Sequence, residues 1–230
     1  MKDNLPFISI ITVVYNGASF LEATIQSVIS QGYGVIEYII IDGASTDGTI
    51  EIIKKHEHKL SYWISEPDKG IYDAMNKGIE KATGSFVYFI NCGDTLLSIP
   101  GDLRNSEADM FCFPVETNTG LRKPKLGFTF FLTNTLPHQG IFYKKSADVF
   151  FDCTYKVFAD YALNIDFRKS GKQIKMHNEP VIAYHSLDGV SNNKKSFAEF
   201  LQLVKAKSGI HFMVLSYLYF KWQGFKRRLL

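Results

Sequence analysis

Residues 85–94 read SFVYFINCGD, an apolar run that stops on polar residues and ends on the acid Asp94. Such a run is typical of a buried strand. In an open α/β sheet, ligands bind in the crevice beyond the carboxyl ends of the strands. A carboxylate there is well placed to hold a divalent cation. The stretch therefore predicts a strand of an α/β sheet with a ligand site at its edge.

The same pattern recurs along the first ninety residues. Apolar runs predict three earlier strands, at Ile8–Val14, Tyr38–Ile41 and Leu60–Ser65. Apolar residues at helical spacing predict the connecting helices, at Ser19–Ser30, Thr46–His56 and Asp73–Ala82. This alternation implies an α/β fold with a Rossmann-like, doubly wound, mostly parallel sheet and right-handed crossovers.

After residue 97 the segments become shorter and richer in Pro, Gly and Asn. Met110–Val115 and Gly140–Lys144 are predicted strands, and Tyr155–Arg168 is a predicted helix. We find no linker long enough to mark a second independent domain, no internal repeat and no low-complexity tract. The pattern therefore favours one domain that continues to about residue 205, followed by a tail over 206–230.

Composition narrows the class of protein. The chain has 230 residues, of which 46% are hydrophobic and 21% charged, which suits one large core. A net charge of +3 is too small to indicate nucleic-acid binding. The three cysteines have no close spacing, which argues against a zinc site or a disulfide framework and suits a reducing cytosol.

The N-terminus resembles a signal sequence only superficially. Its apolar run is β-branched, follows Pro6 and has no small-residue cleavage site, so we interpret it as a strand. No stretch approaches the ~20 apolar residues that span a bilayer. We therefore expect a cytoplasmic protein, located in part at the inner face of the cell membrane.

Two further polar stretches follow predicted strands. Asp42 closes a buried strand, where an acid costs solvation free energy unless it is paired, and it could accept hydrogen bonds from a base or ribose. The alternative is a Gly-bearing turn and a helix cap. Residues 65–78, SEPDKGIYDAMNKG, gather polar groups around a helix start, which favours anions. The alternative there is a solvated loop.

Three longer stretches carry a family resemblance. They are ISIITVVYNGASFLEATIQSVISQ (8–31), YIIIDGASTDGTIEII (38–53) and ISEPDKGIYDAMNKGIEKATGSFVYFINCGDTL (64–96). In this order and spacing they resemble the family 2 glycosyltransferases, inverting enzymes with the GT-A fold. PHQGIFYKKS (137–146), FDCTYKVFADYAL (151–163) and IAYHSLDGVS (182–191) resemble members that build bacterial cell-surface polysaccharides. The resemblance reaches about residue 195.

The resemblance implies a donor site in a nucleotide-binding part, residues 1–97, and an acceptor-binding part, residues 98–205. Thr12 and Tyr15 lie where the family wraps the nucleotide base. Asp42 matches the acid that contacts the base or ribose. Asp68, together with Asn76, belongs to the segment that flanks the nucleotide and its diphosphate.

The resemblance also implies the catalytic groups. Asp94 matches the last acid of the metal-binding motif, which implies Mn²⁺ or Mg²⁺ as cofactor, and Asp160 matches the general base. Many members carry further acids at the metal motif, where this chain has Asn91, Cys92 and Gly93. We expect Asn91 to replace the missing acid with a hydrogen bond to the ribose, and the diphosphate and water to complete the metal shell.

Other acids and two histidines compete for roles. Asp152 and Asp166 are interpreted as solvated, whereas Asp160 has aromatic neighbours that could limit water access. His138 and Gln139 lie in a segment that resembles the family's sugar- or acceptor-facing loop. His185 is a candidate third ligand for Mn²⁺, in a stretch that could close over the diphosphate. For both histidines the alternative is a structural hydrogen bond.

The tail allows two interpretations. Residues 210–220 are apolar and aromatic, and four basic residues follow, Lys221, Lys226, Arg227 and Arg228. The segment could be a helix packed on the core or on a partner subunit. It could instead be an interfacial helix, with 210–228 in contact with the anionic cytoplasmic leaflet.

Together these observations predict a metal-dependent inverting glycosyltransferase. We expect it to transfer a hexosyl or N-acetylhexosaminyl group from a UDP-linked donor to a cell-surface glycan or a polyprenyl-linked acceptor. The lone acid Asp94 keeps a non-catalytic nucleotide-sugar-binding relative as the alternative. A nucleotidyltransferase is disfavoured, because the loop over residues 15–19 has no basic residue. Donor sugar, linkage and oligomeric state are not encoded in these motifs.

Overall fold

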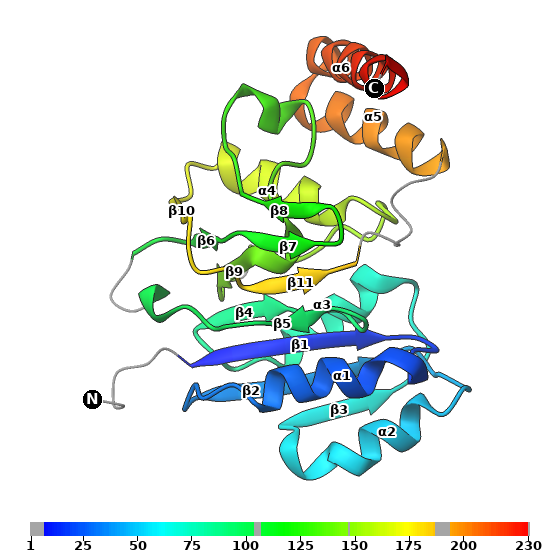
Figure 1. Ribbon diagram of the computed structural model, residues 1–230, viewed down its shortest axis with the longest axis vertical. Coiled ribbons are helices and arrows are strands. Elements are labelled where there is room, and N and C mark those ends of the chain that lie inside the picture. The colour runs from blue at the N-terminus through cyan, green and yellow to red at the C-terminus, as the bar shows by residue number, and fades with distance from the viewer. Residues whose placement is uncertain (1–6, 104–106, 147, 187–193, 230) are drawn as a thin grey trace.

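A seven-stranded sheet runs through the middle of the described part of the molecule, with strand order β10-β6-β9-β4-β1-β2-β3 (Figure 1). The computed structural model describes residues 7–103, 107–146, 148–186 and 194–229. In chain order, the strands of this sheet are β1 (Ile8–Val14), β2 (Ile36–Asp42), β3 (Tyr62–Ser65), β4 (Phe86–Phe89), β6 (Met110–Cys112), β9 (Ile141–Lys144) and β10 (Ile174–Met176).

The N-terminal half of this sheet is parallel. β1 pairs in parallel with β2 and β4, and β2 pairs in parallel with β3. Every residue of β1 is buried, because helices cover both faces of the strand. This confirms the predicted doubly wound, mostly parallel sheet.

Helices on the two faces create two apolar cores. α1 (Ala18–Ile29) and α2 (Thr49–His56) cover one face, where Ile10 of β1 packs with Leu21 of α1. α3 (Ile71–Lys81) and α4 (Ala159–Lys169) cover the other face, where Ile11 packs with Met75 of α3. Because successive side chains of a strand point to opposite faces, the neighbours Ile10 and Ile11 serve different cores.

β9 reverses the direction of the sheet. It runs antiparallel to both of its neighbours, β4 and β6. The chain that enters β9 at Ile141 therefore lies at the same edge of the sheet as the end of β4. Since β9 joins the N-terminal and C-terminal parts in one sheet, the division at residue 97 into a nucleotide-binding and an acceptor-binding part stays a prediction about function.

A second, smaller sheet covers this edge. Its strands are β5 (Thr95–Leu96), β11 (Ala183–His185), β7 (Val115–Thr117) and β8 (Gly120–Arg122), in that order across the sheet. The predicted single strand over Met110–Val115 was wrong. β6 ends at Cys112, and β7 begins at Val115 in the other sheet. Pro114 lies between them and has no N–H with which to continue a ladder.

Two helices close the chain. α5 (Lys194–Ser208) and α6 (Ile210–Leu229) lie side by side at the end of the molecule opposite β3 and α2 (Figure 1). Gly209 joins them with a φ of +97°, which glycine adopts without strain.

The boundary predicted at residue 206 falls inside α5, which ends at Ser208. Among the described residues, no helix has the length and apolar character needed to cross a bilayer. Short 3-10 helices occur at η1 (Glu57–Lys59), η2 (Gly101–Leu103), η3 (Phe128–Phe131) and η4 (His138–Gly140).

Candidate active site

Asp94 lies just beyond β4, and the residue is only 5% exposed. One carboxylate oxygen, Oδ1, is 2.6 Å from Nδ1 of His185 at the end of β11. The other, Oδ2, accepts a hydrogen bond of 2.9 Å from Nε2 of Gln139 in η4. Three segments that are far apart in the sequence therefore converge on one carboxylate.

The backbone around Asp94 is held by α1. Thr24 accepts a hydrogen bond from the N–H of Gly93 at 3.1 Å and donates one to the carbonyl oxygen of Asp94 at 2.8 Å. The N–H of Asp94 bonds to the carbonyl oxygen of Asn91 at 3.0 Å. Gly93 has a φ of +97°, which suits glycine in such a turn. The turn thus presents Asp94 in a fixed direction.

Two residues of this turn were singled out from the sequence. The side-chain oxygen of Asn91 is buried and has no hydrogen-bond partner among the described residues. Unsatisfied buried polar atoms are rare, and a ligand is one way to satisfy them. Burial raises the pKa of the Cys92 thiol to about 12, and the nearby charge of Asp94 adds to this effect. The thiol therefore stays protonated and is a poor metal ligand at neutral pH.

Asp160 lies in the first turn of α4 and is 7% exposed. Its Oδ2 accepts a hydrogen bond of 3.1 Å from Nδ2 of Asn134, and its Oδ1 lies 3.0 Å from the hydroxyl of Tyr72. The same hydroxyl lies 2.6 Å from the carbonyl oxygen of Val157. Burial raises the pKa of Tyr72 well above its usual value, and the charge of Asp160 adds to this shift, so the hydroxyl remains a donor.

His138 lies within electrostatic reach of both acids. Its ring stacks on Phe89 at a centroid distance of 5.6 Å, and both ring nitrogens are buried without a hydrogen-bond partner among the described residues. Burial lowers the pKa of His138, whereas the charges of Asp160 and Asp94 act on the pKa in the opposite direction. Both carboxylates therefore act on one imidazole that is neutral at pH 7.

Tyr15 and Asp68 come together at the carboxyl edge of the parallel strands. Tyr15 is 68% exposed just beyond β1. A Cβ atom on Gly43, which follows β2, would lie 2.5 Å from Oδ2 of Asp68 and 3.4 Å from the ring of Tyr15. The other oxygen of Asp68 accepts a hydrogen bond of 2.8 Å from the N–H of Gly70. The ring of Tyr15 and the carboxylate of Asp68 thus flank the backbone of Gly43, which carries no side chain.

Asp42 is fully buried and already paired. Its oxygens accept hydrogen bonds from the N–H of Ser45 at 2.9 Å, the hydroxyl of Ser45 at 2.5 Å and the hydroxyl of Ser65 at 2.6 Å. These bonds offset the cost of burying the acid. Contact of Asp42 with a base or ribose stays a prediction, and it would require a ligand to replace one of these partners.

Thr12 and Asn76 are likewise buried and engaged. The hydroxyl of Thr12 lies 3.1 Å from that of Tyr38. The side-chain amide of Asn76 forms two bonds of 2.8 Å with the backbone N–H and carbonyl oxygen of Phe151. Asn76 thereby joins α3 to the segment before α4. Contacts of these two residues with a nucleotide stay predictions.

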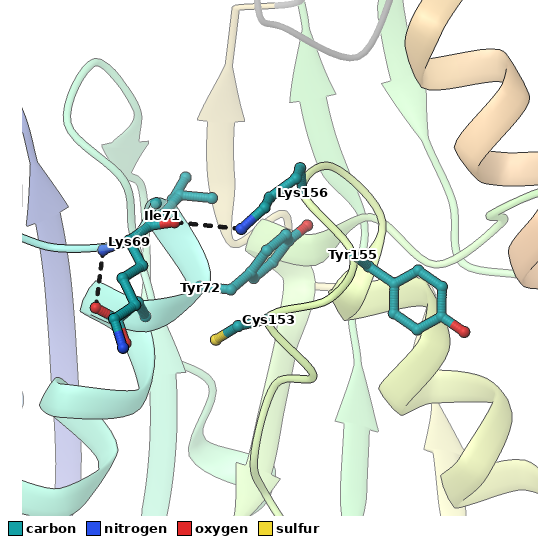
Figure 2. Close-up of a pocket in the computed structure, with 8 residues that line it drawn as sticks. Lys69, Ile71, Tyr72, Cys153, Tyr155 and Lys156 are labelled. Carbon is teal, nitrogen blue, oxygen red and sulfur yellow. Dashed lines mark hydrogen bonds between the residues drawn. The ribbon is translucent and has the colours of Figure 1, made fainter.

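A hollow lies between the start of α3 and the segment before α4 (Figure 2). The ammonium of Lys156 reaches across it to the carbonyl oxygen of Lys69 at 3.4 Å, and the N–H of Lys69 bonds to Asp73 at 2.9 Å. Tyr72 lies beside Lys156 in this view. The hollow therefore places two exposed lysines next to the tyrosine that contacts Asp160.

Two acids considered from the sequence lie outside the site, and two partners of Asp160 were not predicted. Asp152 and Asp166 are exposed and pair with Thr154 and Lys207, as expected for solvated acids. Tyr72 and Asn134, the partners of Asp160, were not assigned a role from the sequence, because neither has a spacing signal that links it to residue 160. Within IAYHSLDGVS, residues 187–191 lie outside the described residues.

The N-terminal part of the chain, which carries Asp94, also matches known sequences. Residues 9–97 match the sequence model of Glycosyl transferase family 2. An uncharacterized glycosyltransferase of Mycobacterium tuberculosis is 43% identical over 90 residues, which cover 39% of this chain and 34% of that protein. The match therefore spans about a third of that relative. The PGL/p-HBAD biosynthesis glycosyltransferase of Mycobacterium bovis is 28% identical over 210 residues, which cover 81% of this chain and 80% of that protein.

Solved structures with low sequence identity show the same fold. S. aureus TarS in complex with UDP superposes with a TM-score of 0.67 at 17% identity, over 90% of this chain and 68% of that chain. A mannosyltransferase from Pyrobaculum calidifontis, in complex with GDP-Man and Mn²⁺, gives a TM-score of 0.68 at 16% identity, over 94% of this chain and 71% of that chain. Residues 9–97 therefore match glycosyltransferase family 2, and the chain has the GT-A fold of these solved structures.

Proposed function

We propose that this protein is an inverting glycosyltransferase (EC 2.4) that uses a nucleotide-sugar donor, with UDP as the nucleotide. The observation that carries this is one segment, residues 134–140, which binds both acids. Its Asn134 bonds to Asp160 and its Gln139 bonds to Asp94. A metal-binding acid and a proton acceptor held by one short segment suit the two roles that a glycosyl transfer requires. The UDP complex of TarS supports the choice of nucleotide.

The donor nucleotide would lie at the carboxyl edge of β1, β2 and β3. Tyr15 and Asp68 would flank the base over Gly43, with Asp42 and Thr12 beneath it. The unsatisfied oxygen of Asn91 would accept a hydrogen bond from the ribose. Asn76 would support the diphosphate side of the site indirectly, because it holds the backbone of Phe151 in the segment before α4. Ligands of α/β sheets bind at this edge as a rule.

The residues around Asp94 fit a divalent cation. Among the described residues, no group of three or more His, Cys, Asp or Glu side chains could hold a metal. Asp94 and His185 would supply one oxygen and one nitrogen ligand for Mn²⁺, whereas Mg²⁺ would be held by Asp94 alone, and diphosphate oxygens would complete the shell in both cases. The side-chain oxygen of Asn91, which has no hydrogen-bond partner among the described residues, is a further acceptor at the same turn. When bound, the cation neutralises the charge that develops on the departing diphosphate.

Asp160 would act as the general base. An acceptor hydroxyl needs its proton removed as its oxygen bonds to the anomeric carbon and the bond from that carbon to the diphosphate breaks. The proton would pass to Asp160, whose carboxylate is oriented by Tyr72 and Asn134. Each carboxylate oxygen keeps a lone pair for this purpose. A single displacement of this kind inverts the anomeric centre, by analogy with glycoside hydrolysis.

The acceptor side would be formed by residues near Asp160. His138 and Gln139 would contact the sugar or the acceptor, and Lys69 and Lys156 border the hollow beside Tyr72. We assign a cell-surface glycan or a polyprenyl-linked acceptor, with transfer of a hexosyl or N-acetylhexosaminyl group. A polyprenyl-linked acceptor would lie at a bilayer surface.

The direct test measures donor binding and donor breakdown. We expect UDP and a UDP-sugar to raise the melting temperature in the presence of Mn²⁺, and slow release of UDP from the UDP-sugar. Asp94→Ala should abolish both effects. Asp160→Asn should keep donor binding but lose about 10²-fold or more in transfer to an acceptor. Asp152→Asn, at an exposed acid, is the matched control. If no nucleotide shifted the melting temperature with Mn²⁺ present, the donor site would be refuted.

A second candidate is a nucleotide-sugar-binding protein without turnover. The observation in its favour is the single acid of the metal motif, where Asn91 and Cys92 precede Asp94. Such a protein should show the Mn²⁺-dependent melting shift with UDP-sugar but release no UDP. Product release in the wild-type protein, absent in Asp94→Ala, would exclude it.

A further inference from the structure

The last helix, α6, packs one face against α5. The ring of Phe220 lies 5.4 Å from those of Phe197 and Phe200. Ser216, one turn earlier on the same face, is fully buried. Residues at this spacing lie along one stripe of a helix. α6 is therefore docked through one face, and its opposite face points away from α5.

The opposite face of α6 is apolar, although it is exposed. Ile210, Val214, Leu218 and Trp222 follow one another at intervals of four, and they are 54%, 46%, 55% and 51% exposed. Leu215 and Tyr217 lie beside this row and are also exposed. We call these six residues the outer stripe. The outward face of a helix in a globular protein is normally polar, and a contiguous apolar patch marks an interaction site.

An aromatic residue of η3 adds exposed apolar surface beside the first turn of α6. Phe128 of η3 is 60% exposed, and its ring lies 5.7 Å from that of Phe212 in the first turn of α6. Phe131 contacts the same ring at 5.4 Å. The exposed apolar surface therefore includes a second segment, about eighty residues earlier in the chain.

The Lys and Arg residues of α6 all lie in its C-terminal half. Residues 210–229 contain no Asp or Glu. Lys221 places its ammonium 5.2 Å from the centre of the Tyr217 ring, and the sequence adds Lys226, Arg227 and Arg228 in the following turns. The side chains of residues 225–229 lie outside those described, so the last three count only as charges of this helix end. Apolar and aromatic residues beside a cationic end are typical of helices that lie in a membrane interface.

We propose that α6 and Phe128 form a docking surface for a membrane that contains anionic lipid, with the outer stripe in the interfacial region and the cationic helix end among the phosphate headgroups. This goes beyond the catalytic proposal, because it requires neither donor nor acceptor. A lipid surface supplies apolar contact and negative charge together. A second copy of α6 supplies apolar contact alone, since this helix has no acid to pair with its basic end.

Vesicle flotation tests the docking surface on the full chain. The vesicles are phosphatidylcholine with or without phosphatidylglycerol. We expect binding to the anionic vesicles and little to phosphatidylcholine alone. Leu218→Glu should weaken binding about tenfold, because it removes an apolar side chain that the membrane would bury and adds a charge that anionic lipid repels. Lys221→Gln should weaken binding to anionic vesicles about fivefold.

Phe20→Glu is the matched control. Phe20 is an exposed aromatic of α1, at the other end of the molecule, and the substitution makes the same change from an apolar to an acidic side chain. It should leave vesicle binding unchanged. Trp222 offers a second measurement. With Trp63 replaced by Phe, the emission of Trp222 should shift to shorter wavelength on anionic vesicles and stay unchanged on phosphatidylcholine alone.

Three outcomes would overturn the docking surface. They are no binding to anionic vesicles, equal binding of the Leu218→Glu and wild-type proteins, and a dimer in sedimentation that Leu218→Glu converts to a monomer. The last outcome would assign the outer stripe to a second copy of the chain. UDP release from a UDP-sugar, measured on the same variants without vesicles, separates these outcomes from failure of the proposed enzyme activity.

Discussion

Asn134 and Gln139 lie five positions apart on one segment, and each holds one acid of the candidate site. Nδ2 of Asn134 bonds to Asp160 at 3.1 Å, and Nε2 of Gln139 bonds to Asp94 at 2.9 Å. The segment leads directly into β9, which is paired with β4. The separation of the two acids is thus linked to the backbone of one short stretch.

Gly140→Ala should disturb this stretch. A Cβ atom at Gly140 would lie 2.3 Å from the carbonyl oxygen of Phe113, and this backbone atom cannot rotate away. We expect a loss of about 2 kcal/mol in the free energy of unfolding, measured in urea, and weaker Mn²⁺-dependent binding of UDP. Gly127→Ala is the control, because its Cβ atom would meet nothing within 4 Å. Equal stability of the two variants would contradict the expected clash.

Tyr72→Phe should loosen the orientation of Asp160 without unfolding the protein. The ring packs against Phe151 at 5.3 Å, and phenylalanine keeps this contact. Loss of the hydroxyl removes a donor that holds the carboxylate of Asp160 in place. We expect kcat to fall about tenfold, with the KM for the donor unchanged. An unchanged kcat would show that the hydroxyl proton goes to the carbonyl oxygen of Val157 instead.

His185→Gln should separate metal binding from nucleotide binding. If His185 is a ligand, the variant should need about tenfold or more Mn²⁺ to reach the melting shift seen with UDP. The smaller shift with UDP alone should stay as in the wild type. His58→Gln, at an exposed histidine of η1, is the control. A normal Mn²⁺ requirement in His185→Gln would restrict this residue to its hydrogen bond with Asp94.

Glu37 predicts a pH dependence of stability at the opposite edge of the sheet. Burial alone would raise the pKa of Glu37, but hydrogen bonds from Ser9, Thr83 and Gly84 lower it below its ordinary value of 4.5. A carboxyl group with a lower pKa in the folded state contributes stability above its unfolded pKa. This contribution is lost as the pH falls through the folded pKa.

Glu37→Gln should therefore lower the free energy of unfolding by about 2 kcal/mol at pH 7. The difference from the wild type should shrink as the pH is lowered below 4.5. Urea unfolding at several pH values measures this difference. Glu80→Gln, at an exposed position of α3, should show no such trend. A constant difference at all pH values would mean that packing, and not the charge, is what the substitution removes.

The N-terminal half of the fold was predictable because its strands are buried on both faces. Runs such as Ile8–Val14 leave no alternative to a central strand, and β1 has the predicted bounds. Beyond residue 97 the described strands have four residues or fewer, which leaves little periodicity to read. β9 confirms the predicted strand over Gly140–Lys144, whereas β8, β10 and β11 were not predicted. The predicted helix over Tyr155–Arg168 begins only at Ala159, because Glu199 of α5 accepts hydrogen bonds from the backbone N–H groups of residues 156–158.

The candidate site was predictable one residue at a time, but its partners were not. Family motifs single out Asp94 and Asp160, yet no spacing indicates that Tyr72 reaches an acid 88 positions later. The saturation of Asp42 by Ser45 and Ser65 was equally invisible, since it depends on where two loops return to the sheet. Such contacts belong to tertiary packing, which a local pattern does not encode.

The reversed strand β9 also has a consequence for how substrates enter. It is bonded along both of its edges, to β4 and to β6, deep in the interior. Separation of β9 from β4 or β6 would leave the backbone N–H and C=O groups of these buried strands without hydrogen-bond partners. The three strands should therefore stay paired while substrates bind and products leave. Substrates should reach the site from the exposed edge of the sheet.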